Sequence, residues 1–184
     1  HISRAHIIRE KGTNRNAFIK GNIDKYSWVD LGSSFLPSSL QAAFLFDQLK
    51  SGHKINKKRK CIFKKYHSFF SKISENYNIS IPKIIEENQI NGHFYWILVP
   101  VGSRTKFIDR ARINQIELTS HYEPLHDSEA GKIYGKSYEN LNISKSLSSQ
   151  IVRFPIHTQM TLSEHRLVLN ILKKTIEESI DRSS

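Results

Sequence analysis

The sequence contains a single cysteine, Cys61, so no disulfide can form within one chain. The composition therefore does not indicate a protein of an oxidising compartment. No apolar run approaches the roughly 20 residues that a membrane-spanning helix needs, and no signal-peptide pattern opens the chain. We therefore expect a cytoplasmic protein with no membrane partner.

The sequence also lacks an initiating methionine, and its only methionine is Met160. The first residues, HISRAHIIREKG, have apolar residues at helical spacing but no helix start signal, and Gly12 is well placed to end that helix. We expect a piece of a longer protein. A chain of 184 residues with 38% hydrophobic residues can still form one domain with its own core.

The formal net charge is +11, which leaves open a non-enzymatic basic module that binds nucleic acid. The sequence has no zinc-finger spacing, no RNP-type aromatic cluster and no basic helix followed by a heptad zipper. The lysines over 57–65 are either a phosphate-binding stripe or a solvated helix face beside an apolar stripe. We favour the solvated face and expect no nucleic-acid partner.

A long helix is predicted over 38–74. Ser38 and Gln41 form a capping-box pattern at its start, and apolar residues recur at helical spacing as far as Ile73. Gly52 marks either a bend or a break in this helix. The preceding stretch, 13–37, has no sustained period and is predicted to be a long loop, which in a compact domain is usually functional.

The rest of the chain alternates between strand and helix patterns. A second capping box, Thr161 with Glu164, starts a final helix that reaches Ile180. The segments predicted before it are a strand over 94–99, a helix over 105–117, an extended segment over 118–125, a helix over 141–149 and a strand over 151–156. This order predicts a small α/β or α+β domain attached to a long helix.

One polar cluster stands out, consisting of His121, Tyr122, His126, Asp127 and Glu129. Two histidines five residues apart with nearby carboxylates could bind a metal, but neither a His-Glu-x-x-His pattern nor paired cysteines are present, and we assign no metal site. A loop that faces a substrate is the stronger interpretation, because His and Tyr offer donors and acceptors at the end of a strand. An ordinary surface loop remains an alternative.

Several motifs occur together in one known family. REKGTNR (9–15), DKYSW (24–28) and GSSFLPSSLQAAF (32–44) have the order and spacing of sugar aminotransferases of the DegT/DnrJ/EryC/StrS family, and HYEPLH (121–126) resembles that family's HYxPLH segment. The resemblance covers essentially the whole chain. It is strongest to the branch that aminates TDP-4-keto-6-deoxyhexoses, the TDP-4-amino-4,6-dideoxygalactose transaminases of surface-polysaccharide pathways.

The resemblance implies an α/β fold, namely the C-terminal part of a fold-type I aminotransferase that uses pyridoxal 5'-phosphate. Residues 1–37 would end the large cofactor-binding domain and carry an interface loop. Residues 38–74 would be the connecting helix, and 75–184 the small C-terminal domain. Such enzymes are homodimers with active sites at the subunit interface.

The resemblance also implies roles for single residues. Ser34 stands where the wider family usually has an Asn that contacts the cofactor phosphate of the neighbouring subunit, and Leu36 replaces an Arg of the same motif. His121, Tyr122 and His126 resemble residues that line the sugar-nucleotide pocket. The lysine that bonds to the cofactor is expected upstream of the segment that begins at His6, so no catalytic residue is assigned. The implied reaction moves an amino group from glutamate to the 4-keto carbon of a TDP-6-deoxyhexose, and the isolated chain is expected to be inactive.

Overall fold

The computed structural model describes residues 1–84, 90–137 and 139–182. These residues form two compact units, His1–Gly52 and His53–Ser184, which are described separately below. Helices and one small sheet make up the regular structure, so the predicted α/β class is confirmed. The finer division at residues 37 and 74 stays a prediction.

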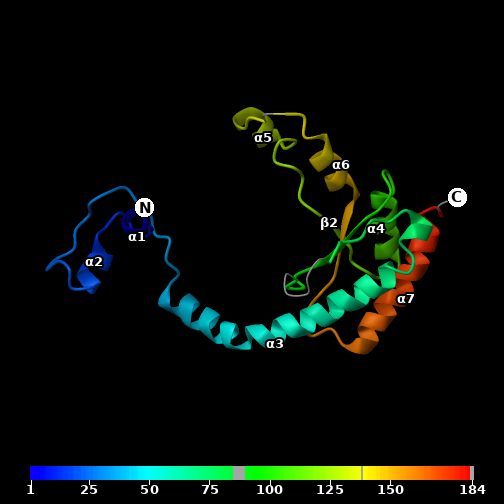
Figure 1. Cartoon of the computed structure of the whole chain (residues 1–184), viewed down its shortest axis with the longest axis horizontal. Helices are drawn as coiled ribbons and strands as arrows, with labels where there is room; N and C mark the ends of the chain where they lie inside the picture. The colour runs from blue at the N-terminus through cyan, green and yellow to red at the C-terminus, as the bar shows by residue number, and fades with distance from the viewer. Residues whose placement is uncertain (85–89, 138, 183–184) are drawn as a thin grey trace. The chain divides into compact units, whose positions relative to one another are not determined.

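The first unit contains two short helices and the beginning of a long one (Figure 1). Helix α1 spans Ile2–Arg9, as its spacing predicts, and α2 spans Arg15–Ile19. Helix α2 lies inside the stretch 13–37, which was predicted to be a loop. The sequence did not predict this helix because five residues are too few to show an apolar period. The loop around it is held by two isolated β-bridges, Glu10 to Ser34 and Thr13 to Trp28.

Helix α3 spans Ser39–Phe70. Its predicted capping box is confirmed, since the Ser38 amide donates to Gln41 Oε1 (2.9 Å) and the Gln41 amide donates to Ser38 Oγ (3.2 Å). Gly52 lies within the continuous helix, so no break occurs there, and the helix ends four residues before the predicted end at 74. In its first turns the apolar side chains of Leu40, Phe44 and Phe46 are largely exposed.

The second unit begins with the remainder of α3 and adds a three-stranded antiparallel sheet. Its further elements are a 3-10 turn (Glu75–Tyr77), β1 (Tyr95–Leu98), α4 (Arg104–Ile113), β2 (Thr119–Ser120), α5 (Glu129–Tyr134), α6 (Asn142–Gln150), β3 (Ile151–Phe154) and α7 (Leu162–Ser179). The strand order is β1-β3-β2. Strand β3 is therefore central, with Trp96 of β1 and Thr119 of β2 on either side of Arg153.

Three of the expected elements are shorter in the structure. The helix predicted over 105–117 ends at Ile113, and Gln115 follows with a positive φ of 64°. Only two residues of the extended segment 118–125 form a strand, and α5 lies in the loop that follows. Strand β3 ends before Pro155, whose nitrogen has no proton to continue the ladder.

The core lies between one face of the sheet and the helices. Alternate residues of the two longer strands, such as Tyr95 and Phe154, are buried against Tyr66 and Phe70 of α3 and against Leu172 of α7. Figure 1 shows the C-terminal part of α3 beside α7, and the rings of Tyr66 and His165 meet there with centres 4.6 Å apart. Burying these rings removes a large apolar area from water and so stabilises this unit. The opposite face of the sheet carries half-buried side chains, among them Trp96, Leu98, Ile151 and Arg153.

Helix α7 begins at its predicted capping box, Thr161 with Glu164, and carries a buried histidine. His165 is 1% exposed, and neither of its ring nitrogens has a hydrogen-bond partner among the described residues. Burial lowers the pKa of His165, and the charge of Lys65 lowers it further. The imidazole therefore stays neutral in the folded chain at a pH where the unfolded chain already binds a proton.

We expect the free energy of unfolding to fall as the pH is lowered from 7.5 to 5. The unfolded chain takes up a proton at His165 near pH 6.5, whereas the folded chain resists it, so acid favours unfolding. Urea denaturation at several pH values measures this slope. His165→Gln should flatten the slope, and His53→Gln, at an exposed position, should leave it unchanged. Equal slopes in all three proteins would contradict the role of His165.

Candidate functional site

The segment after β2 forms one wall of the candidate site and is fixed by short-range hydrogen bonds. Ser128 Oγ donates to the carbonyl of Leu125 (2.7 Å) and accepts from the amide of Gly131 (3.0 Å), which caps α5. Asp127 forms an ion pair with Lys145 of α6 (3.5 Å). These contacts hold the segment 121–131 against α6.

A cavity of about 410 Å³ lies between this segment, α6 and the first residue of β3. His121, Tyr122 and His126 all line it, so the structure brings together the three residues that the sequence predicted to bind substrate. The remaining lining residues are Pro124, Leu125, Ser144, Leu147, Ser148 and Ile151. The cavity thus combines apolar walls with a few hydroxyl and imidazole groups, the usual composition of a site for an organic ligand.

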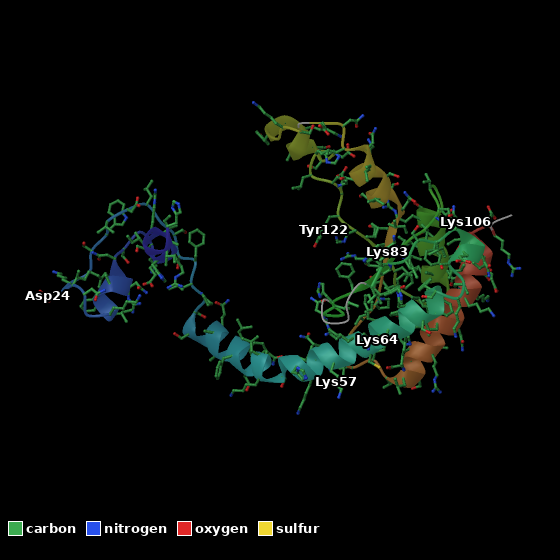
Figure 2. The ribbon with its side chains drawn as sticks, in the orientation of Figure 1. Asp24, Lys57, Lys64, Lys83, Lys106 and Tyr122 are labelled. Atoms are coloured by element: carbon green, nitrogen blue, oxygen red, sulfur yellow. The ribbon has the colours of Figure 1, made fainter. Side chains whose placement is uncertain are left out.

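Two of these side chains have free polar groups. Tyr122 is 79% exposed and projects outward from the chain (Figure 2). The Nδ1 atom of His121 is buried, yet it has no hydrogen-bond partner in the described parts of the chain. A buried polar atom without a partner costs free energy, so the His121 ring is an energetically unsatisfied group beside this cavity.

Arg153 lies next to these residues and is not among the site residues predicted from the sequence. Its Nε and Nη2 atoms donate to the carbonyl of Ser120, at 3.1 and 2.9 Å. Its guanidinium carbon lies 5.7 Å from the centre of the Phe94 ring and 5.9 Å from that of Tyr122. The sequence signal was available: an arginine at an outward position of the predicted strand 151–156.

Ser34 belongs to the first unit and is described with it. It pairs with Glu10, and the neighbouring bonds from the Lys11 amide to the Ser33 carbonyl (3.1 Å) and from the Ser33 amide to the Ile8 carbonyl (3.0 Å) fix its backbone. The residue is exposed, and its hydroxyl has no hydrogen-bond partner within the described ranges. A free hydroxyl on a fixed backbone can donate to an anionic oxygen.

The charges around Ser34 also suit an anion. The one buried carboxylate nearby, Glu10, forms ion pairs with Arg9 (3.4 Å) and Arg15 (3.5 Å), which neutralise it. Lys11 adds a further cation on the same stretch of chain. The residues of this segment therefore fit a phosphate-bearing group.

The model of the DegT/DnrJ/EryC1/StrS aminotransferase family matches residues 2–173. The chain belongs to this family. The sequence resemblance is thereby confirmed, across nearly the whole chain.

Relatives of known structure agree on the fold. The chain superposes with a TM-score of 0.78 on the aminotransferase TlmJ from Streptoalloteichus hindustanus, at 17% identity, covering 95% of this chain and 44% of that one. Spr1654 from Streptococcus pneumoniae, in its PLP form, gives a TM-score of 0.77 at 20% identity, with 94% of this chain and 42% of that one covered.

A sequence relative, the uncharacterized protein MJ1066 of Methanocaldococcus jannaschii, is 25% identical over an alignment of 182 positions. The alignment covers 94% of this chain and 46% of that protein.

The chain thus spans less than half the length of each of these relatives. The aminotransferase fold is confirmed by the family match, and this coverage is consistent with the prediction that the chain corresponds to the C-terminal part of that fold.

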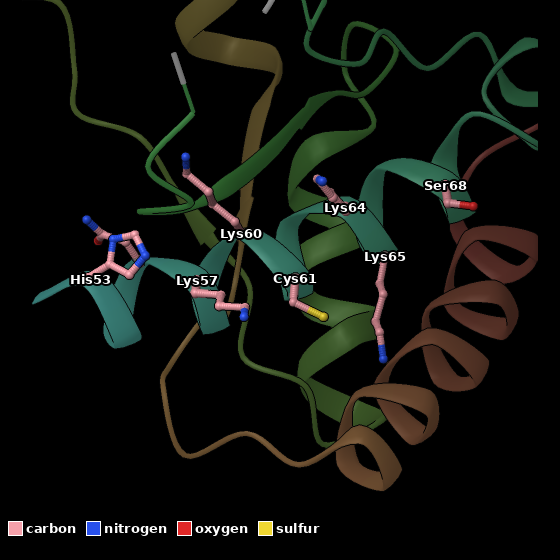
Figure 3. A pocket seen from close by; sticks show the side chains of 8 residues that line it. His53, Lys57, Lys60, Cys61, Lys64, Lys65 and Ser68 are labelled. Carbon is pink, nitrogen blue, oxygen red and sulfur yellow. The ribbon is translucent and has the colours of Figure 1, made fainter. Parts of the chain in front are cut away.

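This family member also has a strongly basic helix. No carboxylate residue occurs between Asp47 and Glu75, and a cavity of about 620 Å³ runs along α3, lined by residues that include Lys57, Lys60, Lys65 and the exposed Cys61. Figure 3 shows Lys60 and Lys65 extending to opposite sides of the helix. Such an arrangement is typical of a solvated face, since the ammonium groups do not converge on one point.

Residues 1–84, 90–137 and 139–182 contain no group of three or more His, Cys, Asp or Glu side chains placed to hold a metal ion. His121 and His126 therefore belong to no such group. None of the helices in these ranges has the length and apolar character needed to cross a bilayer.

Proposed function

We propose that this chain is part of a pyridoxal-phosphate-dependent aminotransferase that transfers an amino group from glutamate to the 4-keto carbon of a TDP-6-deoxyhexose. The observation that carries the proposal is the family match over residues 2–173. The stretch His6–Leu49, which contains DKYSW, adds the choice of the TDP-sugar branch, and the cavity lined by His121, Tyr122 and His126 supports an organic ligand such as a sugar nucleotide.

In this proposal the cavity residues bind and orient the sugar nucleotide. The exposed hydroxyl of Tyr122 exchanges hydrogen bonds with hydroxyl groups of the ligand, and the side chains of His121 and His126 border the same space. Fixing the sugar in one pose makes the transfer effectively unimolecular, which is a large part of what a binding site contributes to rate.

Ser34 would hold the phosphate of the cofactor bound by the neighbouring subunit of a homodimer, and Arg9, Lys11 and Arg15 would supply a positive surrounding. When bound, the cofactor supplies an electron sink that lets the amino group leave one carbon and join another. None of the lysines of the 184 residues is assigned the bond to the cofactor, so we expect these residues alone to be catalytically inactive.

The test uses the full-length enzyme with TDP-4-keto-6-deoxyglucose and glutamate. We expect formation of the TDP-4-amino sugar together with an equal amount of 2-oxoglutarate, both measured by chromatography. The chain of 184 residues, supplied with the same substrates and cofactor, is the matched control and should give neither product. Turnover of a UDP-linked keto sugar but not of the TDP-linked one would contradict the assigned substrate.

The rival function is a basic module that binds nucleic acid, suggested by the net charge of +11. The divergent lysines of α3 do not favour it. It predicts an affinity for DNA that falls steeply as salt is raised. The family membership makes the aminotransferase the better explanation of the same residues.

A further inference from the structure

Arg153 lies at the centre of the face of the sheet that points away from the helical core and carries half-buried side chains. It belongs to the middle strand, β3, opposite Trp96 of β1 and Thr119 of β2. Alternation along β3 buries Val152 and Phe154 on the helical side, so Arg153 is directed to the other face. Phe94 and Tyr122 flank its guanidinium there.

The guanidinium is fixed, but its charge is not neutralised. The two bonds to the Ser120 carbonyl use only part of its five N–H donors, and Nη1 makes no hydrogen bond to any residue that the structure describes. No carboxylate in those ranges forms an ion pair with it. A planar, immobilised cation with free donors is the group best suited to phosphate oxygens.

The surroundings select a ligand with both phosphate and aromatic parts. The Tyr122 ring lies beside the Arg153 guanidinium and also lines the 410 Å³ cavity, so one side chain separates the cation from that cavity. With 79% of Tyr122 exposed, its ring leaves surface on which a base can stack. A free amino acid such as glutamate would use the cation but not the ring.

We infer that Arg153 binds the diphosphate of the substrate's nucleotide, with the base stacked on Tyr122. This inference rests on the proposed function, because it names the part of the sugar nucleotide that this site holds. Arg153 acts in binding, and no proton or electron is transferred by it. Its guanidinium donates from Nη1 to a phosphate oxygen while Nε and Nη2 remain on Ser120.

The experiment is a calorimetric titration of the 184-residue chain with TDP and, separately, with inorganic pyrophosphate. We expect Arg153→Gln to weaken the binding of both by about tenfold or more, the usual effect of losing a hydrogen bond to a charged group. Tyr122→Ala should weaken TDP but not pyrophosphate. Arg166→Gln, at an exposed position of α7, removes the same charge elsewhere and should leave both affinities unchanged.

The inference is overturned if the unmodified chain binds neither probe, or if Arg153→Gln and Arg166→Gln weaken binding equally. It is also overturned if Arg153→Gln changes the binding of glutamate and not of TDP. Should Arg153→Gln fail to fold, as judged by circular dichroism, Arg153→Lys replaces it. That variant keeps the charge but loses the planar fork, and it should also lose most of the affinity.

The titration needs no turnover, so its failure and the failure of the proposed function can be told apart. Arginine-dependent binding of TDP by a protein that aminates no sugar would contradict the proposed function alone. Amination of the TDP-sugar by a full-length Arg153→Gln variant with an unchanged KM would contradict this inference alone.

Discussion

Tyr66→Ala is expected to lower the free energy of unfolding of the second unit by about 3–5 kcal/mol, the range for removing a fully buried aromatic ring. The ring is 0% exposed and lies 5.6 Å from that of Tyr95 and 5.5 Å from that of Phe154, centre to centre. Because these neighbours belong to the sheet and Tyr66 to α3, the substitution opens a cavity where the two layers meet. Urea denaturation followed by circular dichroism measures the change.

Two control variants separate packing from hydrogen bonding. The Tyr66 hydroxyl donates to the carbonyl of Pro155 (3.1 Å), and burial raises the pKa of this phenol, so it stays protonated as a donor. Tyr66→Phe should therefore cost only about 1–3 kcal/mol, for leaving one acceptor unpaired. Tyr134→Ala, at an 86% exposed position, should change stability by less than about 0.5 kcal/mol. A Tyr66→Ala variant as stable as Tyr134→Ala would show that the layers do not pack as described.

Gly12→Ala is expected to unfold the loop that carries Ser34. Gly12 has a φ of +75°, and a Cβ at this position would lie 1.7 Å from the carbonyl oxygen of Asp30. The Gly12 carbonyl also accepts hydrogen bonds from the amides of Val29 (2.8 Å) and Asp30 (3.0 Å). Because the clash is with Asp30 itself, relieving it would break these two hydrogen bonds. Hydrogen exchange of these two amides should become fast, while exchange in the second unit stays unchanged.

Gly21→Ala is the matched control for this prediction. Gly21 has nearly the same dihedral, a φ of +72°, but no atom lies within 4 Å of the position that its Cβ would take. It therefore bears the backbone strain, of about 1–3 kcal/mol, without the collision. Equal acceleration of exchange in the two variants would mean that the close approach to Asp30 has no role.

Local patterns in the sequence predicted much of the fold. Both capping boxes, at Ser38 and at Thr161, needed only the spacing of a hydroxyl and a carboxylate or amide residue, and both are present. The strand around Tyr95 was predicted from its β-branched and aromatic run. The short helices α2 and α5 were not predicted, because their few residues cannot show an apolar period. The length of β2 was overestimated, because its pairing with β3 decides where the strand ends.

The candidate site was predictable only in part. A motif identified His121, Tyr122 and His126, which are neighbours in the chain as well as in space. The other wall of the cavity comes from Ser144, Leu147 and other residues of α6, and no local signal joins that helix to the motif. Arg153 was not predicted as a site residue for the same reason. Its guanidinium is positioned by Phe94 and Ser120, which belong to two other segments and lie beside it only in the folded sheet.

The carbonyl of Ser120 has a further consequence. Ser120 is the last residue of β2 and is bonded directly to His121, so one peptide group joins the segment that begins at His121 and accepts both hydrogen bonds from the Arg153 guanidinium. If the segment and Arg153 bind one ligand as proposed, a shift of this peptide group would either move the guanidinium or break these two hydrogen bonds.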